Sequence, residues 1–508
     1  MKKIGTAFAL VLGFSMQVAC TIQGPAESEI PAPAKEDPPA QPGETNPGET
    51  TPPQNVNDPM ANPPKPGAGK AMVRAIHGSP NAPAVDIYVK GNATPVVTNL
   101  SYGQTSGWLE VPEGKYELEL RAAPSKPSDP IAYSTGELTV PAGAMISAIA
   151  AGLLGAMDDA AFRVIPLVEN FDEMASGKAR VRAIHAGADA PSVDLDVGND
   201  NPAAAEVKNL ERYKDTGADG VLLPAGSALA IGIAKDGARV TSFTTPKLPE
   251  KSNLLVIATG LLAKLPREKD GFALLAVGGM GSVGFIKQDP VVYALHASPD
   301  APTVDAFVGN AEIIDNLKFG QLSKPIQVQP GEYTLDFYGY TAGSARPSGA
   351  PAASASTGKL EAGERYLAAA NGFLSKGSFT LLGFREGFDI NANKSVLRAV
   401  HGSPDAPAVD IGLLQNGQVS TVLFKDLTFT KASAENGLQA EAGHIPVGVA
   451  ATGSPAPVAG FTVPATNGQR AFVIAAGALA PANGQKSFRL AIVDTAPTPW
   501  TVTHVFPH

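Results

Sequence analysis

The chain contains one cysteine and two tryptophans among 508 residues, and only 17% of its residues are charged. A single cysteine cannot form an intramolecular disulfide, so disulfides do not hold this fold together. The net charge of −9 excludes the basic surface that nucleic-acid binding requires. The mostly apolar run at residues 4–14 is shorter than the ~20 residues of a membrane-spanning helix, so we expect no transmembrane segment there.

What the chain does have is one phrase that occurs four times. The copies are VRAIHGSPNAPAVDIYV from Val73, VRAIHAGADAPSVDLDV from Val181, VYALHASPDAPTVDAFV from Val292 and LRAVHGSPDAPAVDIGL from Leu397. We call this phrase the signature. Its histidines are 108, 111 and 105 residues apart, which is the length of a small domain and not of a solenoid turn. The spacing therefore predicts four tandem domains.

The rest of each period predicts an all-β fold. Short apolar segments alternate with turn residues, and glycine and proline together make up 98 of the 508 residues. Such a pattern is typical of antiparallel β-sandwiches, and six to eight strands fit in one period. The predicted segments are a signal peptide (1–19), a lipidated cysteine with a Pro-rich disordered linker (20–70), repeat 1 (71–177), repeat 2 (178–287), repeat 3 (288–392) and repeat 4 (393–508).

The signature is best interpreted as a structural turn between two strands. Alternation in Val73–His77 places the histidine on the core side of the strand, and the aspartate of the next strand on the opposite face. The Pro-rich residues between them form the turn, to which we expect the histidine to hydrogen-bond. The residues of this structural signature are His77, Asp86, His185, Asp194, His296, Asp305, His401 and Asp410.

The same residues invite a catalytic interpretation. Ser79, His77 and Asp86 are the residue types of a nucleophile, a base and an orienting acid. In repeat 2, however, Gly187 replaces the serine. We therefore predict no catalytic residues and no enzymatic activity.

No metal or cofactor site is predicted either. The four signature histidines belong to four separate repeats, and no zinc-binding spacing is present. One alternative is left open, a calcium ion bound by the oxygen-rich stretch from Asp194 to Asn201. The G-x-G-x-x-G pattern at Gly279–Gly284 is interpreted as a flexible linker, because no helix can follow it.

The N-terminus has the order of a secretory signal. Lys2 and Lys3 precede the apolar run, and small residues lead to Cys20. This resembles the lipobox of bacterial lipoproteins, which implies an acyl anchor on Cys20; simple secretion is the alternative. Residues 21–70 contain 13 prolines and few aliphatic residues, so we expect a disordered, extended stalk.

The signature, the Gly-turn strand and the small-residue strand ending in Gly-Leu together resemble the bacterial family called domain of unknown function 4397. The resemblance covers residues 71–508 as four copies. It implies immunoglobulin-like β-sandwich modules outside the cytoplasm, often anchored at the envelope, and it supplies no catalytic residues.

Two functions remain. The first is a non-enzymatic envelope lipoprotein, anchored in a membrane that is expected to be the outer membrane or the cell surface. Its modules would bind envelope or extracellular proteins, glycans less so because aromatic residues are only 6% of the chain. The second is a passive structural spacer without a defined ligand.

Overall fold

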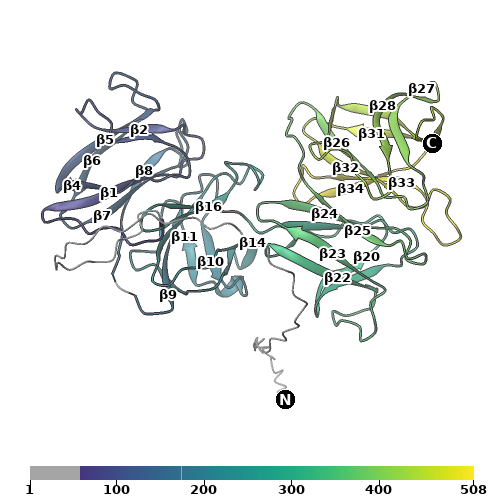
Figure 1. Ribbon diagram of the computed structural model, residues 1–508, viewed down its shortest axis with the longest axis horizontal. Coiled ribbons are helices and arrows are strands. Elements are labelled where there is room, and N and C mark those ends of the chain that lie inside the picture. Colours follow the sequence, from purple (N-terminus) through teal and green to yellow (C-terminus); the bar gives the residue numbers. More distant parts are fainter. Residues whose placement is uncertain (1–57, 173) are drawn as a thin grey trace, which may run out of the picture. The chain divides into compact units, whose positions relative to one another are not determined.

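The computed structural model describes residues 58–172 and 174–508, so Cys20, the signal segment and most of the predicted stalk lie outside the described residues. The described residues form strands and one short 3-10 helix, η1 (Pro202–Ala204). The strands make eight sheets of four or five strands, which pair into sandwiches (Figure 1). The predicted all-β sandwich class is confirmed. Within this part of the chain, no helix has the length and hydropathy to cross a membrane.

Each repeat contains two kinds of sheet. In repeat 1 the mixed sheet has the order β4-β1-β7-β8, and the antiparallel sheet has the order β3-β2-β5-β6. The strands are β1 (Lys70–His77), β2 (Val85–Val89), β3 (Val97–Leu100), β4 (Leu109–Pro112), β5 (Gly114–Ala122), β6 (Tyr133–Val140), β7 (Met145–Ala151) and β8 (Arg163–Val168).

Repeat 2 follows the same order and adds one strand to its mixed sheet, which reads β12-β9-β15-β16-β17; its antiparallel sheet reads β11-β10-β13-β14. The strands are β9 (Lys178–His185), β10 (Val193–Val197), β11 (Val207–Leu210), β12 (Val221–Pro224), β13 (Ala230–Lys235), β14 (Ala238–Thr244), β15 (Asn253–Thr259), β16 (Ala273–Val277) and β17 (Ser282–Ile286). The G-x-G-x-x-G pattern is therefore not a linker, because it turns the chain from β16 into β17.

Repeat 3 has the mixed sheet β21-β18-β24-β25 and the antiparallel sheet β20-β19-β22-β23. The strands are β18 (Val291–His296), β19 (Val304–Val308), β20 (Ala311–Leu317), β21 (Ile326–Gln327), β22 (Gly331–Gly339), β23 (Ala353–Leu360), β24 (Arg365–Asn371) and β25 (Thr380–Arg385).

Repeat 4 has the mixed sheet β29-β26-β32-β33-β34 and the antiparallel sheet β28-β27-β30-β31. The strands are β26 (Ser395–His401), β27 (Val409–Gln415), β28 (Gln418–Leu427), β29 (Leu438–Ala440), β30 (Gly443–Ala451), β31 (Pro457–Ala465), β32 (Arg470–Ala476), β33 (Arg489–Asp494) and β34 (Thr501–Val505).

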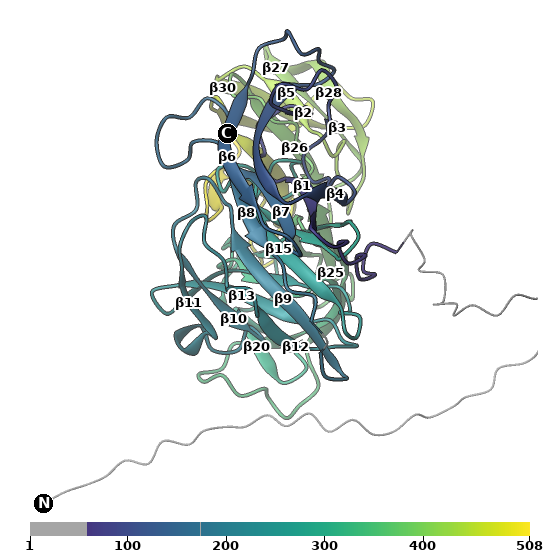
Figure 2. The same ribbon diagram turned by 90° about the vertical axis from the view of Figure 1, so that its left-hand side faces the viewer.

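The mixed sheets contain a parallel pair that a wholly antiparallel sandwich would lack. The first signature strand runs parallel to the small-residue strand in every repeat, as β1 does beside β7 (Figure 2). Six of the seven residues of β7 are buried. Parallel strands are usually covered on both faces, which explains why these segments are rich in alanine and do not alternate.

The second cover of each mixed sheet comes from a neighbouring repeat. One apolar cluster joins the mixed sheets of repeats 1 and 2, and another joins those of repeats 3 and 4. The first includes Ile76, Ile149, Ile184, Leu255, Ile257 and Val277; the second includes Tyr293, Leu367, Phe388, Phe472, Val493 and Trp500. The Tyr293 and Trp500 rings stack with their centroids 4.3 Å apart.

Arg74 makes a buried polar contact between repeats 1 and 2, in addition to the apolar cluster. Its guanidinium lies 2.7 Å from Glu169 Oε1 and donates a hydrogen bond of 2.7 Å to the Gly278 carbonyl. Its side chain is fully buried, and its Cζ lies 4.5 Å from the centroid of the Trp108 ring. Strand alternation alone would have placed this arginine at a solvated surface.

The predicted linker ends before residue 70. Residues from Asp58 onward are described, and the Pro59 carbonyl accepts a hydrogen bond from the Met280 N–H in repeat 2. Met60 packs against an apolar cluster of repeat 2 that includes Leu223 and Leu248.

Replacement of Arg74 by Ala should lower the free energy of unfolding of the first two repeats by about 3–5 kcal/mol, because Glu169 would remain buried without its partner. Urea unfolding followed by Trp108 fluorescence in a Trp500→Phe background would measure this. Lys115→Ala is the control, since its ion pair with Glu137 is exposed and should contribute less than ~1 kcal/mol. An equally small effect of both variants would contradict the structural role of Arg74.

Candidate functional site

The signature histidine closes its own turn in all four repeats. Each histidine is the last residue of the first signature strand and is buried, and its Nε2 atom faces the carbonyl of the proline six residues further along the turn. The Nε2 to oxygen distances are 3.0 Å for His77 and Pro83, 2.7 Å for His185 and Pro191, 2.9 Å for His296 and Pro302, and 3.0 Å for His401 and Pro407.

The partner determines the protonation state of these rings. A carbonyl only accepts, so Nε2 must carry the hydrogen and donate it. The Nδ1 atom of each ring is buried without a partner. Burial lowers the pKa of all four histidines, chiefly because the charged ring would lose its water. The four rings are therefore neutral donors at pH 7, and the predicted hydrogen bond from the histidine to the turn is present in every repeat.

The rest of the turn is tied to the end of the small-residue strand. The Ser79 hydroxyl donates to the Gly152 carbonyl at 2.7 Å, and the serines of repeats 3 and 4 do the same to Gly372 and Gly477. These glycines have φ values of +76°, +85° and +86°, and a Cβ there would collide with a backbone carbonyl. This explains the Gly-Leu that ends the small-residue strand.

A second anchor uses the Asn or Asp two residues after the serine position. Asp405 accepts hydrogen bonds of 2.8 and 2.9 Å from the N–H groups of Leu479 and Ala480. Asp189 and Asp300 bind the corresponding loops of repeats 2 and 3, and Asn81 binds Leu154 in repeat 1. Repeat 2 keeps this anchor although Gly187 has removed the serine.

The signature aspartate binds the neighbouring strand of its own antiparallel sheet. In each repeat one carboxylate oxygen accepts a hydrogen bond from the N–H of a residue with positive φ in the next strand. The pairs are Asp86 and Asn99, Asp194 and Asn209, Asp305 and Asn316, and Asp410 and Asp426, at 2.7–2.9 Å. The N–H groups of Gly453 and Asp426 lower the pKa of Asp410.

These contacts do not form a catalytic triad. The serine hydroxyl donates to a glycine carbonyl and not to the histidine, whose Nε2 is already bonded to the proline carbonyl. The aspartate binds the backbone N–H groups of Asn99 and Ser125 in its own antiparallel sheet and the loop that follows β5. The structure uses the three residue types of a triad to connect strands.

In repeat 2, two side-chain oxygens are free to bind the calcium ion that the sequence left as an alternative. The Asp196 side chain is almost fully buried, and its Oδ2 has no hydrogen-bond partner; the Asn199 Oδ1 is also buried and unpartnered. A Cβ at Gly232 would lie 3.3 Å from the first oxygen and 2.6 Å from the second, so both border the same space. The helix η1 packs over this part of β10 and β13.

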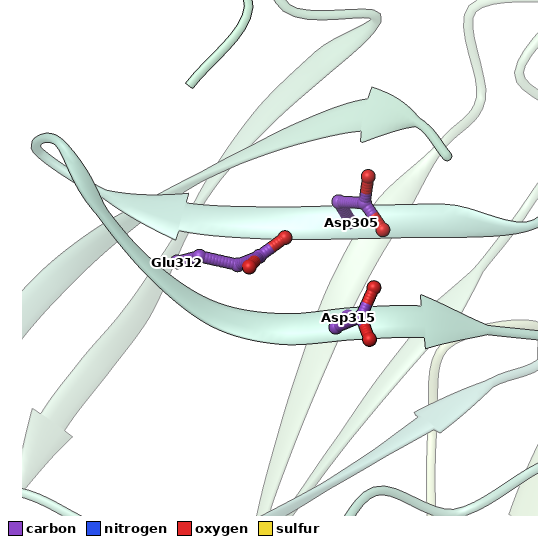
Figure 3. Close-up of side chains that lie close together, drawn as sticks. All are labelled: Asp305, Glu312 and Asp315. Atoms are coloured by element: carbon purple, nitrogen blue, oxygen red, sulfur yellow. The ribbon is translucent and has the colours of Figure 1, made fainter. Parts of the chain in front are cut away.

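A second acidic group occurs in repeat 3, where the sequence indicated none. Asp305, Glu312 and Asp315 have carboxylate oxygens within 4.8 Å of one another, and Figure 3 shows them on the facing strands β19 and β20. Burial, followed by the charges of Asp315 and Asp305, raises the pKa of Glu312. Both Asp305 oxygens already accept backbone N–H groups, so the cluster has little free capacity for an ion.

Sequence reasoning missed a pair of apolar cavities between the sheets. Repeat 4 encloses about 380 Å³ and repeat 2 about 290 Å³, whereas the corresponding cavity of repeat 3 measures about 40 Å³.

Side-chain size at three core positions accounts for this difference. The positions lie one, three and five residues before the strand partner of the signature aspartate. They hold Leu120, Leu118 and Tyr116 in repeat 1; Ile233, Ile231 and Leu229 in repeat 2; Phe337, Leu335 and Tyr333 in repeat 3; and Val449, Val447 and Ile445 in repeat 4. Aligning the repeats on the signature could have revealed this pattern.

Comparison with known families finds a match over two stretches of the chain. The family model described as "Domain of unknown function (DUF4397)" matches residues 71–196 and 290–412. Both stretches match DUF4397. Together they include the signature histidine and aspartate of all four repeats, so the resemblance inferred from the sequence is confirmed for these stretches. No curated protein matches the chain.

A search of solved structures returns, among others, the "Product complex of a multi-modular glycogen-degrading pneumococcal virulence factor SpuA". Its identity to this chain is 11%, and the match covers 77% of this chain. The chain spans only 37% of the length of that protein, and the TM-score is 0.13. A similarity at this level carries no functional information.

The neutral histidines predict a pH dependence of stability. Their folded pKa values lie below the unfolded value of about 6.5, so stability is full above pH 6.5 and falls as the pH drops below it, by up to about 1.4 kcal/mol per pH unit for each histidine. His401→Gln keeps an Nε2 donor but cannot titrate. Urea unfolding at pH 7.5 and 5.5, followed by Trp500 fluorescence in a Trp108→Phe background, should show a smaller loss in this variant. An unchanged loss would contradict the assignment.

The calcium alternative predicts that millimolar calcium raises the melting temperature of residues 54–508. The rise should disappear in Asp196→Asn, which removes the unpartnered carboxylate, and should persist in Asp315→Asn, the control in the acidic group of repeat 3. Thermal melts with calcium and with a chelator measure both. Identical melts of the unmodified protein under the two conditions would exclude the ion.

Proposed function

We propose that this protein is a non-enzymatic lipoprotein of the cell envelope, held by an acyl group on Cys20, whose four sandwiches bind protein partners. The observation that carries the proposal is the use of the signature residues. In every repeat the histidine, the aspartate and, where present, the serine hold strands together, and none is left to act on a substrate.

The packing of the repeats indicates which surfaces remain for partners. The mixed sheets are covered by neighbouring repeats, so the outer faces of the four antiparallel sheets stay accessible. The face of repeat 1 carries the ion pairs Lys90–Glu117 and Lys115–Glu137, and the face of repeat 3 carries Arg346–Asp336. These faces are charged and polar, which suits reversible contacts with other proteins better than permanent apolar interfaces. Two such faces on one chain would add avidity to weak single contacts.

Immobilised residues 54–508 should retain a small, reproducible set of proteins from envelope extract of the source cells at 0.15 M salt and release them at about 0.5 M, because exposed charges are screened there. Reversal of charge on the outer face of repeat 1 by Glu117→Lys with Glu137→Lys should reduce retention, while Arg267→Lys, away from that face, serves as the control. Retention of nothing above a heat-unfolded sample would contradict the proposal and favour a passive spacer.

A further inference from the structure

The interior of repeat 4 has the features of a ligand site. Its cavity of about 380 Å³ lies between the mixed and the antiparallel sheet. One end is at the signature turn, where Ser403 and Leu479 form the wall; the other is at Ala440 and Glu441. Because Ala440 pairs with Ser395 at the start of β26, the cavity follows β26 along its length and is elongated.

The cavity wall is almost entirely aliphatic. Four lining residues have polar side chains: His401 and Ser403 at the turn, and Gln439 and Glu441 at the opposite end. The first two already donate to backbone carbonyls, and the last two are exposed to solvent. Water inside would find few hydrogen-bond partners, and a dry apolar cavity of this size attracts an apolar ligand.

The end of the cavity at Ala440 and Glu441 lacks a plug that is present in repeat 3. In repeat 3 that end is packed by Val328, Tyr333 and Leu360, and the Tyr333 hydroxyl donates to the Gln329 carbonyl at 2.8 Å. Repeat 1 has Tyr116 at the same position, bonded to the Pro112 carbonyl. Repeat 4 has Ala440, Ile445 and Ala465 at the corresponding positions.

In the similar cavity of repeat 2, a residue from outside the repeat occupies the corresponding end. Met60, which precedes repeat 1 in the chain, lines this cavity and packs with Leu223 and Leu248 at the end where the tyrosine lies in repeats 1 and 3. Repeat 4 has no such cover among the described residues that line its cavity.

We propose that repeat 4 binds an unbranched aliphatic chain in this cavity, with the polar end of the ligand at Glu441 and Lys394. The Lys394 Nζ lies 2.8 Å from Glu441 Oε1, so an ion pair lies at this end of the cavity. Taking about 30 Å³ for a water-sized group, the space holds roughly twelve methylene-sized groups. The elongated shape fits a saturated chain better than a compact ring system. The acyl chain of a free fatty acid and that of a phospholipid share this chemistry.

Dodecanoate is the probe of choice, titrated into residues 54–508, which form one compact unit without the segment before Gln54. Isothermal titration and native mass spectrometry should detect saturable binding. A second titration uses dioctanoyl phosphatidylcholine below its micelle concentration. Binding of dodecanoate alone would identify the ligand as a free fatty acid, and binding of both probes would identify it as an acyl chain with either headgroup. Binding of neither, or tighter binding of naphthalene than of dodecanoate, would overturn the proposal.

The variant that copies the repeat 3 plug locates the site. Ala440→Val with Ile445→Tyr should weaken dodecanoate binding at least tenfold, whereas Leu229→Tyr, the same change in repeat 2, should leave it within twofold. Val447→Leu, which narrows the middle of the cavity as Leu335 does in repeat 3, is the second variant should the first fail to fold by Trp500 fluorescence. Loss of binding in Leu229→Tyr with full binding in the repeat 4 variants would overturn the assignment to repeat 4.

Discussion

The hydrogen bond from the signature histidine to the proline that ends the turn is the contact on which each sandwich depends. It joins residues six positions apart, for example His401 and Pro407, and so fixes the turn that carries the chain from the mixed sheet to the antiparallel sheet. The turn also positions Asp405 against the loop after β32 and Asp410 against β28. Buried donors and acceptors need partners, and this set supplies partners for one another across both sheets.

The repeats combine this constant frame with a variable interior. Loss of the serine at Gly187 is tolerated because the aspartate anchor remains. The core positions tolerate larger changes in side-chain size. Phe337 in repeat 3 corresponds to Val449 in repeat 4, and together with the neighbouring positions this exchange accompanies a change in cavity volume from about 40 to about 380 Å³. A frame held by polar contacts near the turn permits such changes, because core packing is not what fixes the path of the chain.

Much of the fold could be predicted from the sequence, since the signature recurs at domain spacing and its alternation places the histidine inside. The parallel pairing of β1 with β7 could not, because alternation describes the faces of a strand and not its neighbours. Arg74 was unpredictable for a related reason: the surface that buries it belongs to repeat 2, some 200 residues away in sequence. The cavities depend on the summed volume of side chains that face one another from different strands, such as Ile445 and Ala440. The pattern of a single strand does not give this sum. The polar roles of His77 and Asp86 were predictable because they are local.

The measurement closest to the central claim is the tautomer and charge of the signature histidines, read by ¹⁵N NMR of histidine-labelled residues 54–508 at pH 7. The four signature imidazoles and that of His504, whose Nε2 lies 3.0 Å from the Gly320 carbonyl, should be neutral with the hydrogen on Nε2. The four signature signals should vanish from this class one by one in His77→Gln, His185→Gln, His296→Gln and His401→Gln, and the His504 signal should remain. Charged rings, or neutral rings with the hydrogen on Nδ1, would contradict a turn held by donation to the proline carbonyl.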